Sequence, residues 1–129
     1  MSGIEIYLKK VDLNLVLDWL DSKFKQTNFE VFLEEADYIL YRYDGLYRDR
    51  AIPVIIQLTQ VETRHSIVTS IWFNATATPW ISSLECGREA YRYLKIPIIC
   101  EPDRNKYPYP GDFVLIDKQG ERIVCLDEE

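Results

Sequence analysis

The sequence predicts an α+β protein: a mixed, largely antiparallel sheet of about seven to eight strands with two helices on one face. Three observations lead to this fold class. Segments in which apolar and polar residues alternate outnumber segments with helical spacing. Most of these strands follow one another through short turns, as hairpins do. Two helical segments interrupt them, which gives the element order β-α-β-β-β-β-α-β-β-β.

The first strand and the first helix are distinguished by a change of apolar period. Residues 4–8 alternate, with Ile4, Ile6 and Leu8 on one face, as in a half-buried strand. Asp12 can then cap a helix, because its carboxylate accepts hydrogen bonds from backbone N–H groups that lack partners. The helix is expected to end near residue 25, and its apolar stripe consists of Leu13, Val16, Leu17, Leu20 and Phe24.

Residues 29–43 favour a β-hairpin. Residues 29–34 alternate, residues 38–43 are rich in β-forming side chains, and residues 35–37 supply the turn. A helix over residues 30–42 is the competing interpretation. The Asp44-Gly45 pair is expected to end the second strand, and a polar loop is expected over residues 48–50.

The second half of the chain is predicted from turn lengths and one capping motif. Residues 54–61 and 66–74 read as strands joined by four residues, a typical hairpin length. Ser82 and Glu85 fit a capping box, which predicts a helix over residues 83–94. A short buried strand over 96–100, a polar loop over 101–112 and a last hairpin of 113–117 and 121–125 complete the chain, with Gly120 in the tight turn.

Length and composition predict one domain over residues 1–129, with an acidic tail, residues 126–129, that frays. The 129 residues are 47% hydrophobic, which suits one ordinary core. The net charge of −6 argues against sequence-independent nucleic-acid binding and fits a basic protein partner. No apolar stretch is long enough to span a bilayer, so no membrane partner is expected. The absence of a signal-peptide pattern predicts a cytoplasmic location with reduced cysteines.

One edge of the predicted sheet is the expected place for a ligand. The helix over residues 83–94 would make the strands before and after it parallel, if both belong to one sheet. The loops 76–83 and 101–112 would then meet beyond the strand ends, where open sheets bind ligands. The residues grouped there as ligand- or partner-binding candidates are Thr78, Trp80, Ser82, Ser83, Arg104, Lys106, Tyr107 and Tyr109. An anion or a peptide would suit them, although simple capping by Ser82 and packing by Trp80 are the favoured interpretation.

Cys86 is the candidate reactive thiol, because it falls in the first turns of that helix, where the helix dipole favours a thiolate. A buried cysteine that serves only as a small apolar side chain is the more common case. His65, the single histidine, lies in a predicted turn at the opposite edge, which disfavours a Cys–His pair. One histidine and scattered cysteines predict no metal site, and the lack of a glycine-rich phosphate loop predicts no cofactor.

The leading functional expectation is a small non-enzymatic interaction or regulatory protein, of the inhibitor or immunity kind, that binds a basic partner. The acidic balance, the 13% aromatic content and the lack of a catalytic set support it. A protein partner or a second copy, in a homodimer, could use an aromatic sheet face expected to contain Tyr7, Phe32, Tyr41, Tyr43 and Trp72. The alternative is a small-ligand or anion-binding domain, or a small enzyme, that uses the edge formed by loops 76–83 and 101–112.

Overall fold

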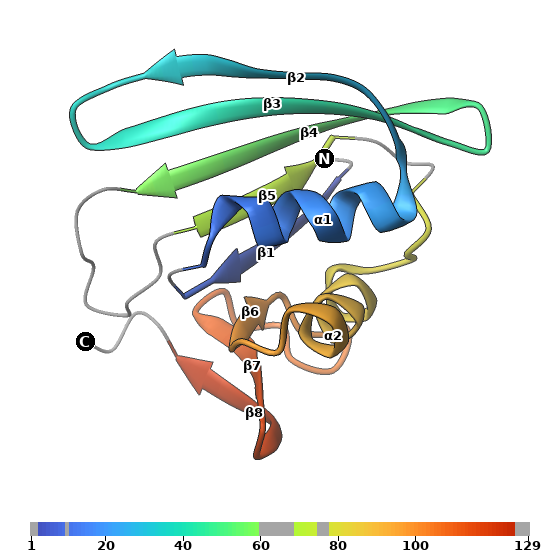
Figure 1. Cartoon of the computed structure of the whole chain (residues 1–129). Helices are drawn as coiled ribbons and strands as arrows, with labels where there is room; N and C mark the ends of the chain where they lie inside the picture. Colours follow the sequence, from blue (N-terminus) through green and yellow to red (C-terminus); the bar gives the residue numbers. More distant parts are fainter. Residues whose placement is uncertain (1–2, 10, 60–68, 75–77, 126–129) are drawn as a thin grey trace.

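The computed structural model describes residues 3–9, 11–59, 69–74 and 78–125. Their helices and strands follow in the predicted order (Figure 1). The elements are β1 (Ile4–Leu8), α1 (Leu13–Lys23), β2 (Lys25–Glu34), β3 (Tyr38–Tyr47), β4 (Arg50–Thr59), β5 (Thr69–Phe73), α2 (Ser83–Leu94), β6 (Ile98–Cys100), β7 (Asp112–Asp117) and β8 (Gly120–Cys125).

The eight strands form one sheet in the order β2-β3-β4-β5-β1-β6-β7-β8. The α+β class is confirmed, but every neighbouring pair is antiparallel, so the expectation of a mixed sheet is corrected. The crossover through α2 does leave β5 and β6 running in the same direction. They are not neighbours, because β1 lies between them: Ile6 faces Ile71 on one side and Cys100 on the other.

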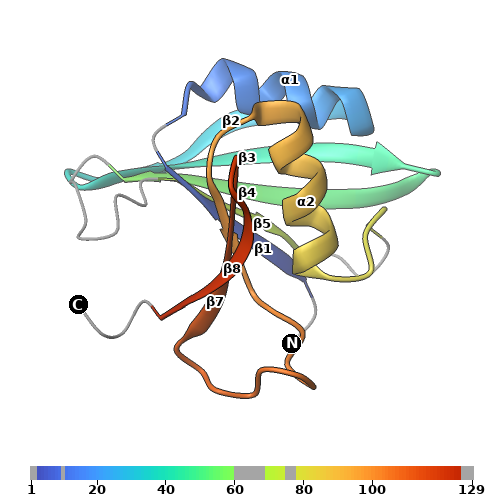
Figure 2. The same cartoon turned by 90° about the horizontal axis from the view of Figure 1, so that it is seen from below.

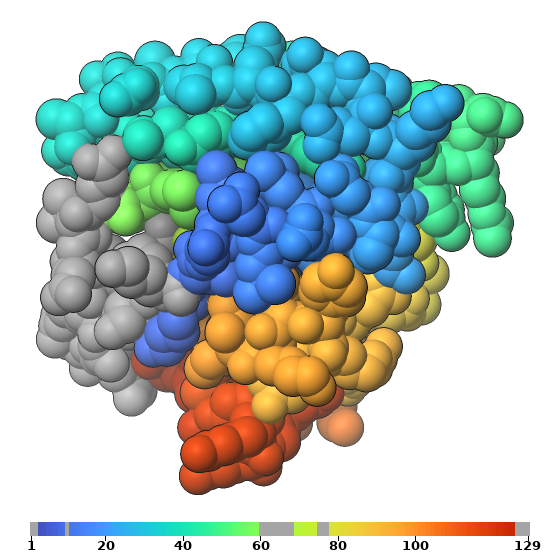
Figure 3. Space-filling model, in the orientation of Figure 1, coloured from blue at the N-terminus to red at the C-terminus, as the bar shows by residue number. Residues whose placement is uncertain are grey.

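Both helices cover the same face of the sheet, as predicted. Figure 2 shows α1 and α2 on one side of the strands, and Figure 3 shows them side by side between β2 and β8. Ile4, Ile6 and Leu8 of β1 point toward them and are buried. These residues belong to one continuous hydrophobic cluster that includes buried side chains of both helices and of β3 to β7.

Four aromatic side chains form the centre of the core between α1, α2 and β5. Trp19 stacks on Trp80 with ring centroids 5.7 Å apart, and Phe73 meets the Trp80 ring at 5.0 Å. Phe24, which follows α1, contacts both Phe73 and Trp80. Trp19 is absent from the predicted apolar stripe, yet only 1% of its surface is exposed. The helical face that packs inward therefore includes this larger side chain.

The segment that was ambiguous between a hairpin and a helix is a hairpin, and it is longer than predicted. β2 and β3 each have ten residues and pair antiparallel. The Asp44-Gly45 pair does not end β3. Instead, β3 continues through Gly45. The missing side chain of this glycine leaves room for Phe24, since a Cβ at Gly45 would lie 2.7 Å from the Phe24 Cβ. The turn comes later, at Arg48 and Asp49, which both have positive φ.

The expected aromatic sheet face is divided between the two sides of the sheet. Tyr43 is on the helix side: it is fully buried, and its hydroxyl donates to Asp21 Oδ1 at 2.7 Å. Tyr41 also packs against the helix-side core. Tyr7 points to the opposite side, where it meets the ring of Phe113 edge-on at 6.2 Å. The alternation of each strand decides this division, since neighbouring residues point to opposite faces.

The remaining strand pairs agree with the predicted hairpins. β4 pairs with β5, although the connecting turn at residues 62–65, with His65, lies outside the described residues. β7 pairs with β8, and Gly120 adopts a φ of 108° in the turn. The tail 126–129 also lies outside the described residues. In the part of the chain that is described, neither helix is long and apolar enough to cross a membrane.

Candidate functional site

Residues from the two loops predicted to meet at one sheet edge do line a common cavity. β5 and β6 end at the edge where β1 begins, because β1 runs antiparallel to both. The cavity has a volume of about 490 Å³. It is lined by Gly3, Ile4, Ile81, Ser82, Ser83, Leu84, Glu101, Pro102 and Asp103.

The polar groups of this cavity do not suit an anion. The Ser82 hydroxyl accepts a hydrogen bond from the Glu85 backbone N–H at 3.1 Å, which is its expected capping role. The Ser83 hydroxyl accepts from the Glu5 backbone N–H at 3.3 Å. Glu101 and Asp103 supply two carboxylates to the lining, and a bound anion would be repelled by them.

The predicted cationic and aromatic residues of the second loop are spread apart. The Arg104 guanidinium donates to the carbonyl oxygens of Tyr107 and Tyr109 and lies over the Phe113 ring. It therefore holds its own loop in place. Lys106 and Tyr107 line a neighbouring cavity of about 420 Å³, and Tyr109 is 69% exposed.

Thr78 and Trp80 do not reach the cavity. The Thr78 hydroxyl donates to the backbone oxygen of Trp80 at 2.8 Å, which fixes the turn before α2. Trp80 is only 4% exposed and belongs to the aromatic centre of the core. The packing role that the sequence favoured for Trp80 is the one the structure gives it.

The environment of Cys86 does not favour the predicted reactive thiol. Its side chain has no exposed surface, and burial raises its pKa well above the ordinary value. Cys100, a close neighbour on β6, is also fully buried, and burial raises its pKa to about 12. A nucleophilic thiol needs access and a stabilised thiolate, and neither is present here. Across the described ranges, no three His, Cys, Asp or Glu side chains gather where they could hold a metal ion.

Of the exposed apolar residues on β2, the sequence pointed only to Phe32, as part of the expected aromatic sheet face. β2 is an edge of the sheet and pairs only with β3 among the described strands. Three successive residues of β2 are exposed, Val31 by 54%, Phe32 by 58% and Leu33 by 39%, and we call them the β2 patch. The register shifts between Val31 and Leu33, so Phe32 lies in a β-bulge. Bulges redirect side chains, which accounts for three neighbouring apolar residues being exposed together.

The surroundings of the β2 patch are acidic. Residues 26–41 include Glu30, Glu34, Glu35 and Asp37 and no lysine or arginine, and the nearest cation across the sheet is Arg42 of β3, which lies opposite Glu30. Glu34, Glu35 and Asp37 lie in or beside the turn between β2 and β3 and are exposed. This charge run is visible in the sequence. The sequence does not show that β2 lies at the edge of the sheet, where these carboxylates can face a partner.

No family model, no curated protein and no solved structure matches this chain.

Proposed function

We propose that this protein is a non-enzymatic interaction protein that binds an extended, basic segment of a protein partner along β2. The observation that carries the proposal is the β2 patch: three exposed apolar residues on an edge strand. An edge strand leaves backbone N–H and C=O groups on its outer side, and an extended peptide can add to them as a further strand. Phe32 and its two neighbours would supply apolar contacts to such a peptide.

The charge around β2 favours a basic partner. Glu30 and Glu34 flank the β2 patch, and Glu35 and Asp37 follow in the turn. Lysine or arginine side chains of a bound segment would face these carboxylates and speed its association. A second copy of this chain is a poorer fit at this surface, because antiparallel pairing of β2 with β2 centred on Phe32 would place Glu30 opposite Glu34. An inhibitor or an immunity protein of a basic partner would use such a surface.

Two earlier expectations have less support. The ligand edge between residues 76–83 and 101–112 has carboxylates in its cavity and its arginine held by its own loop. A homodimer through the aromatic sheet face stays a prediction, and Tyr43, one of its expected residues, is buried on the other side.

The proposal is tested with a fluorescent synthetic peptide of about ten residues, long enough for one strand, in which valine and lysine alternate. Fluorescence anisotropy measures its binding, and hydrogen exchange measures protection of the β2 amides. We expect saturable binding that weakens with salt, and protection over residues 29–34. The substitution Phe32→Ser is expected to weaken binding about tenfold, as truncation of an aromatic anchor does. Ile123→Ser on β8, where Ile123 is 38% exposed, is the matched control and should bind as the unaltered protein does.

Two further peptides separate strand addition from general charge attraction. A valine–glutamate peptide should fail to bind, because its carboxylates meet those beside β2. A valine–lysine peptide with a central proline should bind weakly, because proline removes a backbone donor and breaks the strand. If the proline peptide binds as tightly as the regular one, or if Phe32→Ser changes nothing, β2 is not the binding surface.

A further inference from the structure

The β-bulge at Phe32 changes which side chains of β2 share a face of the sheet. Around the bulge, Glu30 pairs with Arg42, Val31 with Tyr41, Leu33 with Leu40 and Glu34 with Ile39. A step of four residues along β2 thus corresponds to a step of three along β3, because Phe32 has no partner of its own. An added strand without a bulge would pair across Phe32 in the same way as β3 does.

The bulge places Glu30 and Glu34 on opposite faces of the sheet. Glu34 lies in line with Ile39 of β3 and Leu58 of β4, and Leu58 packs against the core on the helix side. Glu30 lies in line with Arg42. Because β3 is regular and Arg42 is three residues from Ile39, Arg42 and Glu30 point to the other face. In a regular strand, residues four apart would share a face.

Both carboxylates are exposed and form no ion pair with any described residue. Arg42 lies opposite Glu30, but its Nε donates to the two oxygens of Asp44 at 3.2 and 3.1 Å. The hydrogen bond that Glu30 accepts comes from the neutral amide of Asn28, at 3.5 Å. The carboxylates of Glu30 and Glu34 can therefore both take a cation from a bound partner.

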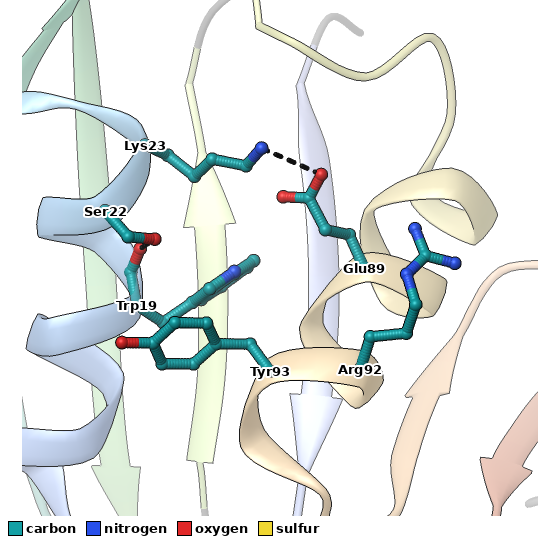
Figure 4. A pocket seen from close by; sticks show the side chains of 6 residues that line it. All are labelled: Trp19, Ser22, Lys23, Glu89, Arg92 and Tyr93. Carbon is teal, nitrogen blue, oxygen red and sulfur yellow. Dashed lines mark hydrogen bonds and ion pairs between the residues drawn. The ribbon is translucent and has the colours of Figure 1, made fainter.

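Carboxylates on the helix side of the molecule meet cations of the same chain. Figure 4 shows Lys23 of α1 reaching Glu89 of α2 beside an open cavity, with Nζ 2.9 Å from Oε1. Glu121 of β8 is likewise paired with Arg88 of α2. Because these carboxylates already have partners, they offer less to a basic segment than the two on β2 do.

Given strand addition at β2, on which this inference rests, we propose that β2 selects segments with two basic residues three positions apart and two apolar residues between them, as in Lys-Val-Val-Lys. One cation lies beside Glu30 and the other beside Glu34, on opposite faces of the added strand. The apolar residues lie opposite Val31 and Leu33, next to Phe32. The spacing holds for a segment that runs antiparallel or parallel to β2, because the positions along β2 set it.

Other spacings match one carboxylate at a time. Lysines two positions apart lie on one face, so a lysine beside Glu30 places the other opposite Leu33. Adjacent lysines place the second opposite Val31. In both cases the displaced lysine also replaces an apolar contact with the β2 patch. Lysines four positions apart share a face as well, so they cannot meet two carboxylates on opposite faces.

The test compares three peptides of about ten residues that have the same composition and net charge, long enough for one strand. Each has two lysines and two valines between flanking threonines, in the central orders Lys-Val-Val-Lys, Lys-Val-Lys-Val and Val-Lys-Lys-Val. Fluorescence anisotropy at low salt gives the dissociation constants. We expect Lys-Val-Val-Lys to bind about three- to fivefold more tightly than either isomer, the effect of one further cross-strand charge pair. Added salt should reduce this preference.

Variants of the protein identify the carboxylates responsible. In Glu34→Gln only Glu30 is left to meet a lysine, so the three isomers should bind alike, within about twofold. Glu35→Gln is the matched control. It removes the same charge from the next residue, which lies in the turn beyond β2, and it should keep the preference for Lys-Val-Val-Lys. Circular dichroism reports whether each variant keeps its fold.

The possible failures of this inference and of the proposed function give different results. Equal binding of the three isomers to the unaltered protein would overturn the inference and leave strand addition at β2 standing. A preference that persists in Glu34→Gln would also overturn it, since another group would then recognise the spacing. If no isomer binds, strand addition itself is rejected, and the inference with it.

Discussion

The two edge strands of the sheet, β2 and β8, differ in what their side chains meet. On β8, Glu121 accepts two hydrogen bonds from Arg88 of α2, at 2.6 and 2.9 Å. Arg122 donates two to Asp117 of β7, at 3.1 and 3.0 Å. On β2, the corresponding outer stretch exposes the β2 patch instead. One edge is held by ion pairs to its own molecule, and the other presents apolar side chains to the solvent.

This difference separates a protected edge from an available one. Proteins protect edge strands with charged side chains, short length or bulges, because an exposed edge can pair with other chains. β8 is short and charged, and its ion pairs link it to α2 and β7. β2 is longer and apolar in its second half, and its carboxylates and two register shifts limit indiscriminate pairing. An edge with this combination suits selective binding of a basic strand.

The largest expected effect comes from the same substitution made at two positions eight residues apart. Phe24→Ala should lower the free energy of unfolding by about 3–5 kcal/mol, because Phe24 is 4% exposed and packs on Phe73 and Trp80. Phe32→Ala should change it by less than about 0.5 kcal/mol, because Phe32 is mostly exposed. Urea denaturation measures both. Similar losses at the two positions would mean that the β2 patch is structural and not a binding surface.

The second expected effect concerns the three cysteines on the β8 side. Cys125, at the end of β8, is partly exposed, whereas Cys86 and Cys100 are fully buried. Burial raises the pKa of Cys100 to about 12, so its thiolate is scarce at neutral pH. Cys86 and Cys100 should therefore react with iodoacetamide at least about 100-fold more slowly than Cys125. Mass spectrometry of the digested protein gives the three reaction rates. Fast reaction of Cys86 with iodoacetamide would support the prediction that it is a reactive thiol.

The third expected effect tests how closely α2 packs against β6. A Cβ at Gly87 would lie 2.9 Å from the Cys100 Sγ and 3.4 Å from its Cβ. Gly87→Ala should therefore lower the free energy of unfolding by about 1–3 kcal/mol, despite the better helix propensity of alanine. The double variant with Cys100→Ala should be more stable than the sum of the two single losses, since the new methyl occupies the space of the sulfur. Additive losses would rule out this close contact.

The smallest expected effect is the contribution of the β8 ion pair. Arg88 holds the pKa of the Glu121 carboxyl below its ordinary value through a hydrogen bond. A lowered pKa in the folded state stabilises the protein above the ordinary glutamate pKa, and this contribution is lost as the pH falls below it. Because both side chains are more than one-third exposed, Glu121→Gln should cost less than about 1 kcal/mol near neutral pH.

Comparing the unaltered protein with Glu121→Gln at neutral and acidic pH measures this contribution. The difference in the free energy of unfolding should shrink as the pH falls below the ordinary glutamate pKa. Glu34→Gln on β2 is the control, since Glu34 makes no ion pair with a described residue, and it should change stability by less than about 0.5 kcal/mol. Equal effects of the two substitutions on the free energy of unfolding would show that ion pairs do not stabilise the β8 edge more than the β2 edge.

The candidate site residues show where sequence-based prediction was limited. The capping role of Ser82 was predictable, because a capping box is a local motif of four residues. The meeting of its loop with residues 101–103 also followed from the crossover connection. The burial of Trp80 and the attachment of Arg104 to its own loop depend on contacts that no local pattern encodes.

By itself, the sequence determined the class, the order of the elements and the overall acidity of this protein. Alternation, helical spacing and capping act within a few residues of backbone, so they can be read along the chain. Only the tertiary structure decided that β1 separates β5 from β6 and that β2 is an edge. Strand pairing joins residues far apart in the chain, and the best packing of the whole core selects it. That selection exposes the β2 patch and buries Trp19 and Trp80 together in the core.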